Sequence, residues 1–131
     1  MAHYFTREEA EALLPAITIV LHKIQERRGK IRVLEEELEA LHVRSTGNGH
    51  HLYGRIVKLQ KDLLEEVQAL RSAVGELQAF GCELKDVDTG LIDFLSLRDG
   101  QEVYLCWRLG EERIAFWHPL HTGFAGRQPL E

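Results

Sequence analysis

The last stretch of the chain, FWHPLHTGFAGRQPLE at residues 116–131, gathers side chains that could bind a metal ion. His118 and His121 have an H-x-x-H spacing, and the proline between them indicates a turn rather than a helix. Imidazole and carboxylate groups together are a common ligand set for divalent ions. One hypothesis is therefore a metal site that combines both histidines with one or two carboxylates from neighbouring strands, for which Asp86, Asp93 and Asp88 are the candidates. Zn²⁺, Mn²⁺ or Fe²⁺ would suit these ligands.

The same residues also have a structural interpretation, which the sequence leaves open. His118 could donate a hydrogen bond to a carboxylate or a backbone carbonyl, while Trp117 fills the edge of a sheet. The glycines before Arg127 allow a tight chain reversal, after which Arg127 would bridge to Asp93 or Asp99. An arginine fork could instead hold an anionic ligand. The residues considered for such a ligand or bridge are Arg127, Arg98 and Trp107.

The two cysteines and a second pair of histidines give weaker indications of a functional site. Cys82 and Cys106 are far apart and form no C-x-x-C pattern, so we interpret both as small packing residues. Cys106 is a candidate nucleophile, but no nucleophile-elbow motif surrounds it and covalent catalysis is not expected. His50 and His51 are adjacent in a predicted turn, and we interpret them as exposed residues that could bind a metal between molecules.

Two long helices must carry the segment that holds these groups. Thr6 and Glu9 have the spacing of a capping box, in which a hydroxyl and a carboxylate satisfy free backbone N–H groups, so a helix begins here. Apolar residues then recur in steps of three and four, which is typical of a coiled-coil seam. A second run with the same stepping follows and ends before Gly81.

A cluster of turn residues, STGNG at 45–49, separates the two runs and predicts an antiparallel hairpin that pivots at Gly47. In such a hairpin, two residues that face each other are equally far from the pivot along the chain, so their position numbers always add up to the same value. The two runs satisfy this condition with Gly47 as the pivot. Arg28 and Glu66 form the charged pair, which would disfavour slipped registers, unless both side chains extend into solvent. The predicted pairs are Ile17–Leu77, Leu21–Ala73, Ile24–Leu70, Arg28–Glu66, Ile31–Leu63 and Leu38–Ile56.

Residues 81–131 are predicted to form a small antiparallel sheet. Apolar and polar side chains alternate over 102–109 and again over 113–118, which indicates a β-hairpin about Gly110. Asp99-Gly100 marks a turn before it, and one or two further strands precede that turn. We expect a three- or four-stranded meander that covers apolar residues at the base of the helical hairpin.

The fold class is therefore α+β: a long antiparallel helical hairpin (coiled coil), followed by a small antiparallel β-meander packed at its base. We expect a single domain over 1–131, with the hairpin at 6–80, its turn near 45–50, and the β subdomain at 81–131. A formal charge of −5 argues against general nucleic-acid binding. We also expect no membrane segment and a cytoplasmic location.

One family shares these features. The segment KDVDTGLIDFLSLRDGQEVYLCWRLGEERIAFWHPLHTGFAGRQPL, following a helical hairpin, resembles the bacterial and archaeal domain of unknown function DUF2203. The resemblance covers nearly the whole chain and is most specific from Lys85 to Leu130. Leu95 stands where the family suggests proline, and His121 where it suggests an acidic residue. The resemblance implies the fold, and it implies no particular activity.

Two functional classes compete, and the sequence favours the first. A non-enzymatic scaffold would self-associate as a homodimer, or bind a protein partner, through apolar residues beyond the facing pairs. These are Leu34, Leu41, Val57, Leu64 and Val67. A divalent-metal-binding protein would instead use the His/Asp site. A third possibility rests on shape, which resembles transcription factors that reach into the RNA polymerase channel; those factors carry acids at the tip, where this chain has histidines and glycines.

Overall fold

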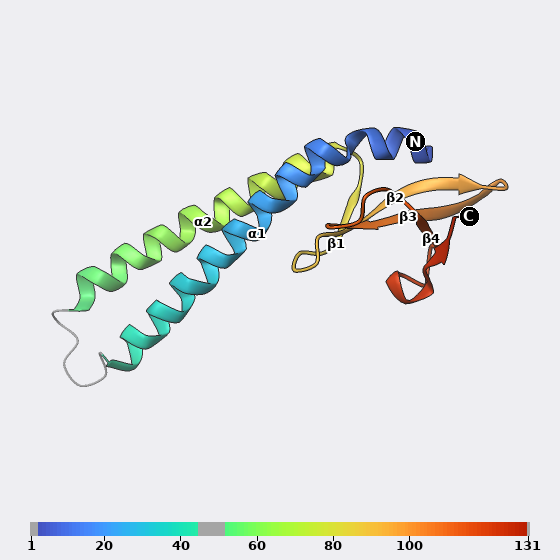
Figure 1. Ribbon diagram of the computed structural model, residues 1–131. Coiled ribbons are helices and arrows are strands. Elements are labelled where there is room, and N and C mark those ends of the chain that lie inside the picture. The colour runs from blue at the N-terminus through green and yellow to red at the C-terminus, as the bar shows by residue number, and fades with distance from the viewer. Residues whose placement is uncertain (1–2, 45–51, 131) are drawn as a thin grey trace.

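The computed structural model describes residues 3–44 and 52–130, and it has the predicted α+β architecture (Figure 1). Two packed helices precede a five-stranded antiparallel sheet whose strands follow chain order. The predicted turn near 45–50, with Gly47, His50 and His51, lies outside the described residues. The elements are α1 (Arg7–Arg44), α2 (Tyr53–Ala79), β1 (Glu83–Asp86), β2 (Leu91–Arg98), β3 (Gln101–Arg108), β4 (Phe116–Pro119), the 3₁₀ turn η2 (Phe124–Gly126) and β5 (Gln128–Pro129).

The capping box forms at the start of α1 as predicted. The Thr6 amide donates to Glu9 Oε1 over 2.8 Å, and the Glu9 amide donates to Thr6 Oγ1 over 3.0 Å. The helices then run for 38 and 27 residues, which at 1.5 Å per residue is about 57 and 40 Å. They therefore project well beyond the sheet (Figure 1). Neither described helix has an apolar stretch sufficient to cross a membrane.

Apolar side chains hold the helices together in two separate clusters. In the base cluster, Ile17, Leu21 and Ile24 pack with residues of α2 and of the sheet. The distal cluster is smaller, with Leu38, Leu41 and Leu59 buried and Leu34, Leu52, Ile56 and Leu63 packed against them. Leu34 and Leu41 were expected to lie outside the helix contact, and this expectation is wrong. Both share one face of α1 with Leu38, because they lie four and three residues from it.

The charged pair between the clusters also differs from the prediction. Arg27 Nη1 lies 3.0 Å from both carboxylate oxygens of Glu66. Arg28, the predicted partner of Glu66, instead lies with Nη1 3.8 Å from Asp88 Oδ1. Asp88 belongs to the turn before β2 and lies outside both helices. The spacing of residues within the helices therefore could not identify it as the partner of Arg28. The Arg28–Glu66 pair is therefore wrong, and Arg27 takes the place of Arg28.

The sheet is a meander, as predicted, but it has one strand more than the expected maximum. β2 and β3 pair without interruption, and Asp99 and Gly100 turn between them with φ of 53° and 79°. β4 is shorter than the predicted strand at 113–118 and begins at Phe116. The reason is that the Ile114 amide donates to Glu11 Oε2 of α1 over 2.9 Å rather than to a strand.

The two faces of the sheet have different neighbours. Ile92 and Phe94 of β2, and Leu105 and Trp107 of β3, join the base cluster beneath the helices. Residues on the opposite face lie on the same side as η2, away from α1 and α2 (Figure 1). Because successive side chains of a strand alternate between faces, the strand register decides which residues meet the helices.

The base cluster predicts unequal effects for two isoleucines of the same helix. Ile24 is fully buried, whereas Ile19 is 69% exposed. Ile24→Ala should lower the free energy of unfolding by about 2–5 kcal/mol, because it removes buried methyl groups and leaves a cavity. Ile19→Ala is the control and should change it by less than about 0.5 kcal/mol. Chemical denaturation followed by circular dichroism measures both, and equal effects would contradict the described packing.

Candidate functional site

Three neighbouring strands bring one acid, one thiol and one imidazole together on the face of the sheet away from the helices. Asp93 of β2 is directly opposite Cys106 of β3. His118 of β4 is opposite Tyr104, two residues from Cys106 along β3. The small thiol side chain of the middle strand leaves room for the carboxylate and the imidazole to meet over it. One ligand atom from each of Asp93, Cys106 and His118 lies within 4.8 Å of the others.

These three side chains are buried although they lie on the face away from the helices. Asp93 and His118 are each 2% exposed and Cys106 is fully buried. The segment after β4 returns across this face, so that Arg127 contacts Cys106 through a hydrogen bond from Nε to Sγ of 3.4 Å. On the other side the Tyr104 ring lies 5.6 Å from the His118 ring. Burial of so many polar atoms requires that each has a partner.

His118 lies between two oxygen atoms. Its Nδ1 is 2.8 Å from the Pro119 carbonyl oxygen, and its Nε2 is 3.0 Å from Asp93 Oδ2. A carbonyl oxygen only accepts, so the Nδ1 contact requires a proton on Nδ1, and a neutral ring then has a lone pair on Nε2. A lone pair facing a carboxylate oxygen is repulsive. The contact between Nε2 and Asp93 therefore needs a cation, either a proton or a metal ion.

Asp93 has unused bonding capacity. Its Oδ1 is buried and has no hydrogen-bond partner among the described residues. Burial raises the pKa of Asp93, and the charge of His118 opposes this rise. A buried oxygen without a donor is rare in folded proteins and calls for an explanation such as a bound ion. Asp93 Oδ1 is thus available as a ligand atom.

The environment of Cys106 disfavours a free thiolate. Burial raises the pKa of Cys106 to about 11, and the hydrogen bond from Arg127 only partly opposes this rise. A thiol with this pKa is a poor nucleophile near neutral pH, since the thiolate is the reactive form. Burial likewise raises the pKa of Cys82 to about 11, and Cys82 packs in the base cluster. The packing interpretation therefore describes Cys82 better than Cys106.

Arg127 closes this face through a two-bond contact with Glu111. Its Nη1 and Nη2 donate to Glu111 Oε2 and Oε1 over 2.8 and 2.6 Å, and Nη2 also donates to the Cys106 carbonyl oxygen over 3.3 Å. The guanidinium also lies over the Phe116 ring, 4.2 Å from its centroid. The predicted internal bridge of Arg127 thus exists, but its partner is Glu111 rather than Asp93 or Asp99. Glu111 lies in the turn after β3, where no sequence pattern marked it.

Two of the expected metal ligands lie outside the cluster. His121 is exposed on the loop that follows β4. Asp86 accepts hydrogen bonds at Oδ2 from the Thr89 amide and hydroxyl, over 3.1 and 2.6 Å, and so stabilises the turn before β2. Cys106 takes part instead, although we interpreted it as a packing residue. The signal for it was available, because the strand pairing that predicts the β-hairpin also aligns Cys106 with neighbouring strands.

Trp107 and Arg98 lie away from the cluster. Trp107 packs beneath the helices, and its Nε1 donates to the Glu111 carbonyl oxygen over 3.1 Å. The guanidinium of Arg98 lies over the Trp117 ring, 5.0 Å from its centroid. Trp117 pairs with Leu105 across β3 and β4 and therefore faces the helices. Neither Trp107 nor Arg98 therefore contributes to the Asp93–Cys106–His118 cluster.

The Arg127–Glu111 contact predicts a pH-dependent contribution to stability. Burial alone would raise the pKa of Glu111. The hydrogen bonds from Arg127 and from the Arg108 amide, together with the charges of both arginines, outweigh burial and lower the pKa of Glu111 from its ordinary value. Glu111→Gln should therefore lower the free energy of unfolding by about 2 kcal/mol at pH 7. The loss should disappear as the pH falls through the folded pKa, because the carboxylate is then protonated in both states.

Denaturant unfolding at several pH values measures this difference. Glu112→Gln is the matched control, since Glu112 is the adjacent and exposed acid. A difference between the parent and Glu111→Gln proteins that stays constant from pH 7 to pH 3 would contradict a charge-dependent contact.

One of three comparisons with known proteins identifies a family. The family model described as "Uncharacterized conserved protein (DUF2203)" matches residues 3–130. Neither the curated proteins nor the solved structures include a match to this chain. Because the match spans nearly every residue, including both helices and the whole sheet, this chain belongs to the DUF2203 family.

Proposed function

We propose that this protein binds a divalent metal ion through Asp93, Cys106 and His118. The observation that carries the proposal is the buried oxygen Asp93 Oδ1, which has no partner among the described residues. It lies beside a histidine–carboxylate contact that itself needs a cation. One metal ion would satisfy both requirements, because Nδ1 of His118 is already oriented by the Pro119 carbonyl oxygen.

The donor atoms favour Zn²⁺ or Fe²⁺ over Mn²⁺. A thiolate is a soft ligand, and imidazole suits zinc and iron, whereas manganese prefers oxygen. A thiolate from Cys106 and a carboxylate from Asp93 would balance the two positive charges of the ion. Arg127 and Glu111 balance each other close by. The complete site would therefore be electrically neutral, as a buried site requires.

A proton is the competing occupant of the His118–Asp93 contact. It would produce a buried imidazolium–carboxylate pair in which the Cys106 thiol keeps its proton and donates a hydrogen bond to Asp93. The two occupants differ at Cys106, because a metal ion binds the thiolate and so displaces the thiol proton. Cys106 is therefore the residue that distinguishes a metal centre from an ion pair.

Titration of the metal-free protein with Co²⁺ and Zn²⁺ tests the proposal. Co²⁺ should give a thiolate charge-transfer absorption that Cys106→Ser abolishes and that Cys82→Ser, the matched control, retains. Zn²⁺ at about a hundred times its dissociation constant should raise the free energy of unfolding by about 2.7 kcal/mol. Affinity should rise by about tenfold or more per pH unit near neutrality, because the thiol, with a pKa of about 11, loses its proton on binding.

Several outcomes would overturn the metal proposal. These are the absence of the cobalt–thiolate band in the parent protein, an equal band in Cys106→Ser, or no stabilisation by Zn²⁺ or Fe²⁺. Elemental analysis of the purified protein adds an independent measurement. His118→Asn should also lose binding, and circular dichroism shows whether that variant remains folded.

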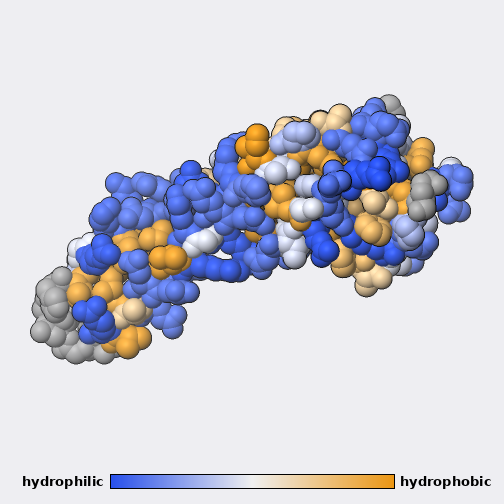
Figure 2. Space-filling model, viewed as in Figure 1, coloured by the Kyte–Doolittle hydropathy of each residue, from blue (hydrophilic) through white to orange (hydrophobic). Residues whose placement is uncertain are grey.

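Self-association through the helical hairpin is a second candidate function. Tyr53, Val57 and Leu64 lie four and seven residues apart on α2, hence on one face, and are 69%, 44% and 59% exposed. Apolar side chains lie among charged ones toward the far end of the hairpin (Figure 2). A stripe of this kind supports burial against a second copy in a four-helix arrangement. The proposal is a homodimer with a scaffold role.

Light scattering over a range of concentrations tests the dimer. The parent protein should have twice the monomer mass at high concentration, and the double substitution Val57→Lys with Leu64→Lys should reduce it to the monomer mass. Ile19→Lys is the control, because Ile19 is more exposed than either residue but lies on the other helix near the sheet. A parent protein that stays monomeric throughout would exclude self-association.

A further inference from the structure

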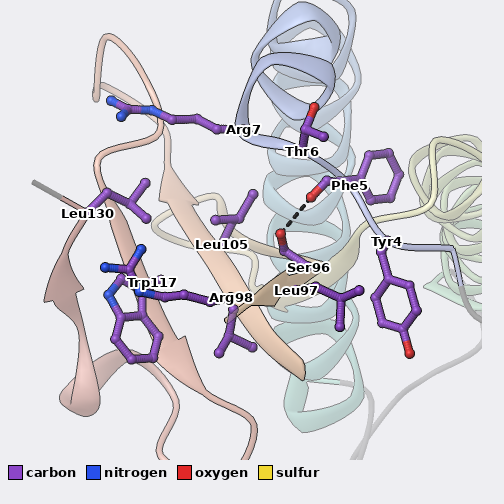
Figure 3. Close-up of a pocket in the computed structure, with 11 residues that line it drawn as sticks. Tyr4, Phe5, Thr6, Arg7, Ser96, Leu97, Arg98, Leu105, Trp117 and Leu130 are labelled. Atoms are coloured by element: carbon purple, nitrogen blue, oxygen red, sulfur yellow. Dashed lines mark hydrogen bonds between the residues drawn. The ribbon is translucent and has the colours of Figure 1, made fainter. Parts of the chain in front are cut away.

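A second site lies on the helix-facing side of the sheet, where it is separate from the metal cluster. A cavity of about 360 Å³ opens between the N-terminal segment and the strands β2, β3 and β4. Figure 3 shows Phe5, Thr6 and Arg7 along one side, with Ser96 and Arg98 of β2 below them and Tyr4 at the right. This volume falls within the range of pockets that bind small molecules.

The cavity is positively charged although the chain as a whole is acidic. Among the described residues that line it, Arg7 and Arg98 are charged and none is acidic. The whole chain has a formal charge of −5. The electrostatic environment therefore selects an anion.

The two arginines are available for a ligand. Arg98 stacks on Trp117 and forms no ion pair within the described part of the chain. Arg7 contacts Glu11 of its own helix, but only at 3.7 Å through Nε. In Figure 3 both side chains extend toward the side of the cavity where Trp117 and Leu130 lie. Leu130 lies between the two guanidinium groups in this view, so Arg98, which has no ionic partner among the described residues, is the arginine that can hold a carboxylate or phosphate group through its planar fork.

Apart from Tyr4, Thr6 and Ser96, the remainder of the lining is apolar. Leu105 and Val103 are buried beneath the cavity, and Trp117 and Leu130 form its far side. The N-terminal wall is tied to β2, because the Phe5 amide donates to the Leu95 carbonyl oxygen over 2.8 Å and Ser96 Oγ donates to the Phe5 carbonyl oxygen over 2.6 Å. The cavity is thus largely preformed, with apolar walls and a cationic rim.

We propose that this cavity binds a small organic anion whose carboxylate or phosphate head pairs with Arg98 and whose flat apolar body packs against Trp117 and Leu105. Arg98 is pre-positioned for the head group, since stacking on the indole ring fixes its guanidinium plane. A body the size of one aromatic ring with a short chain fits the volume. The site is independent of any metal at the opposite face.

Fluorescence titration of the Trp107→Phe protein tests the proposal, because Trp117 is then the remaining tryptophan. The probes are 3-phenylpropanoate, phenyl phosphate, inorganic phosphate and the neutral 3-phenylpropanamide. The phenyl anions should change the Trp117 emission saturably and should bind about ten- to a hundredfold more tightly than the amide, as expected for a hydrogen-bonded charge. Inorganic phosphate should bind more weakly than either phenyl anion, because it lacks the apolar body.

Variants of the rim arginines complete the test. Arg98→Gln should weaken phenyl-anion binding by about tenfold or more, and Arg98→Lys should restore only part of it, since a lysine lacks the planar fork. Arg71→Gln, an exposed arginine of α2 outside the cavity, is the control and should bind as the parent does. Equal affinity for the anion and the amide, unchanged binding by Arg98→Gln, or no binding of any probe at millimolar concentration would overturn the site. Chemical shifts of the Leu105 and Leu130 amides in the Trp107→Phe and parent proteins exclude an effect of the background substitution.

Discussion

The antiparallel register of β2, β3 and β4 determines the rest of the molecule. It directs Ile92, Phe94 and Leu105 toward the helices and leaves Asp93, Cys106 and the β4 imidazole on the opposite face. A shift of one residue in any of these strands would exchange the two sets and bury charge beneath the helical hairpin. The apolar base of the hairpin enforces the register, because two helices alone cannot cover their own apolar surface. The fold and the candidate site therefore depend on the same strand register.

Both faces of this small sheet are covered, and the two covers differ in chemistry. The helices bury apolar side chains on one face. On the other face the segment after β4 returns with Arg127, whose charge is balanced by Glu111. A polar cover of this kind excludes water from Asp93 and Cys106 without requiring them to be apolar. That exclusion raises the pKa of both groups and makes any cation that reaches them strongly held.

The sequence predicted the elements well and the partners of charged groups less well. Helix periodicity, the capping box and strand alternation depend on local spacing, so they specified α1, α2 and β3 closely. Long charged side chains reach several positions and choose partners from distant segments. For this reason Arg28 contacts Asp88 and Arg127 contacts Glu111, neither of which the patterns indicated.

The candidate site, too, was predicted only in part from the sequence. His118 and Asp93 could be proposed from residue type, and the structure places them in contact. His121 shares the motif spacing but is exposed, because the turn at Pro119 directs the following residues away from the sheet. Cys106 was assigned to packing because a lone thiol in an alternating strand carries no motif. The position of Cys106 in the cluster depends on which residues lie opposite it on the adjacent strands, and this is known only once the sheet is assembled.

The division of the hairpin core into two clusters has a mechanical consequence. Between the base and distal clusters the helices are joined by the Arg27–Glu66 contact, and the apolar residues Ile31 and Val67 there are only half-buried. The smaller distal cluster buries less apolar surface than the base cluster, so local opening of the outer turns should cost less free energy than opening of the inner turns, which are docked on the sheet. Separate clusters also mean that a local opening at the far end of the hairpin would leave the side chains of the base cluster buried.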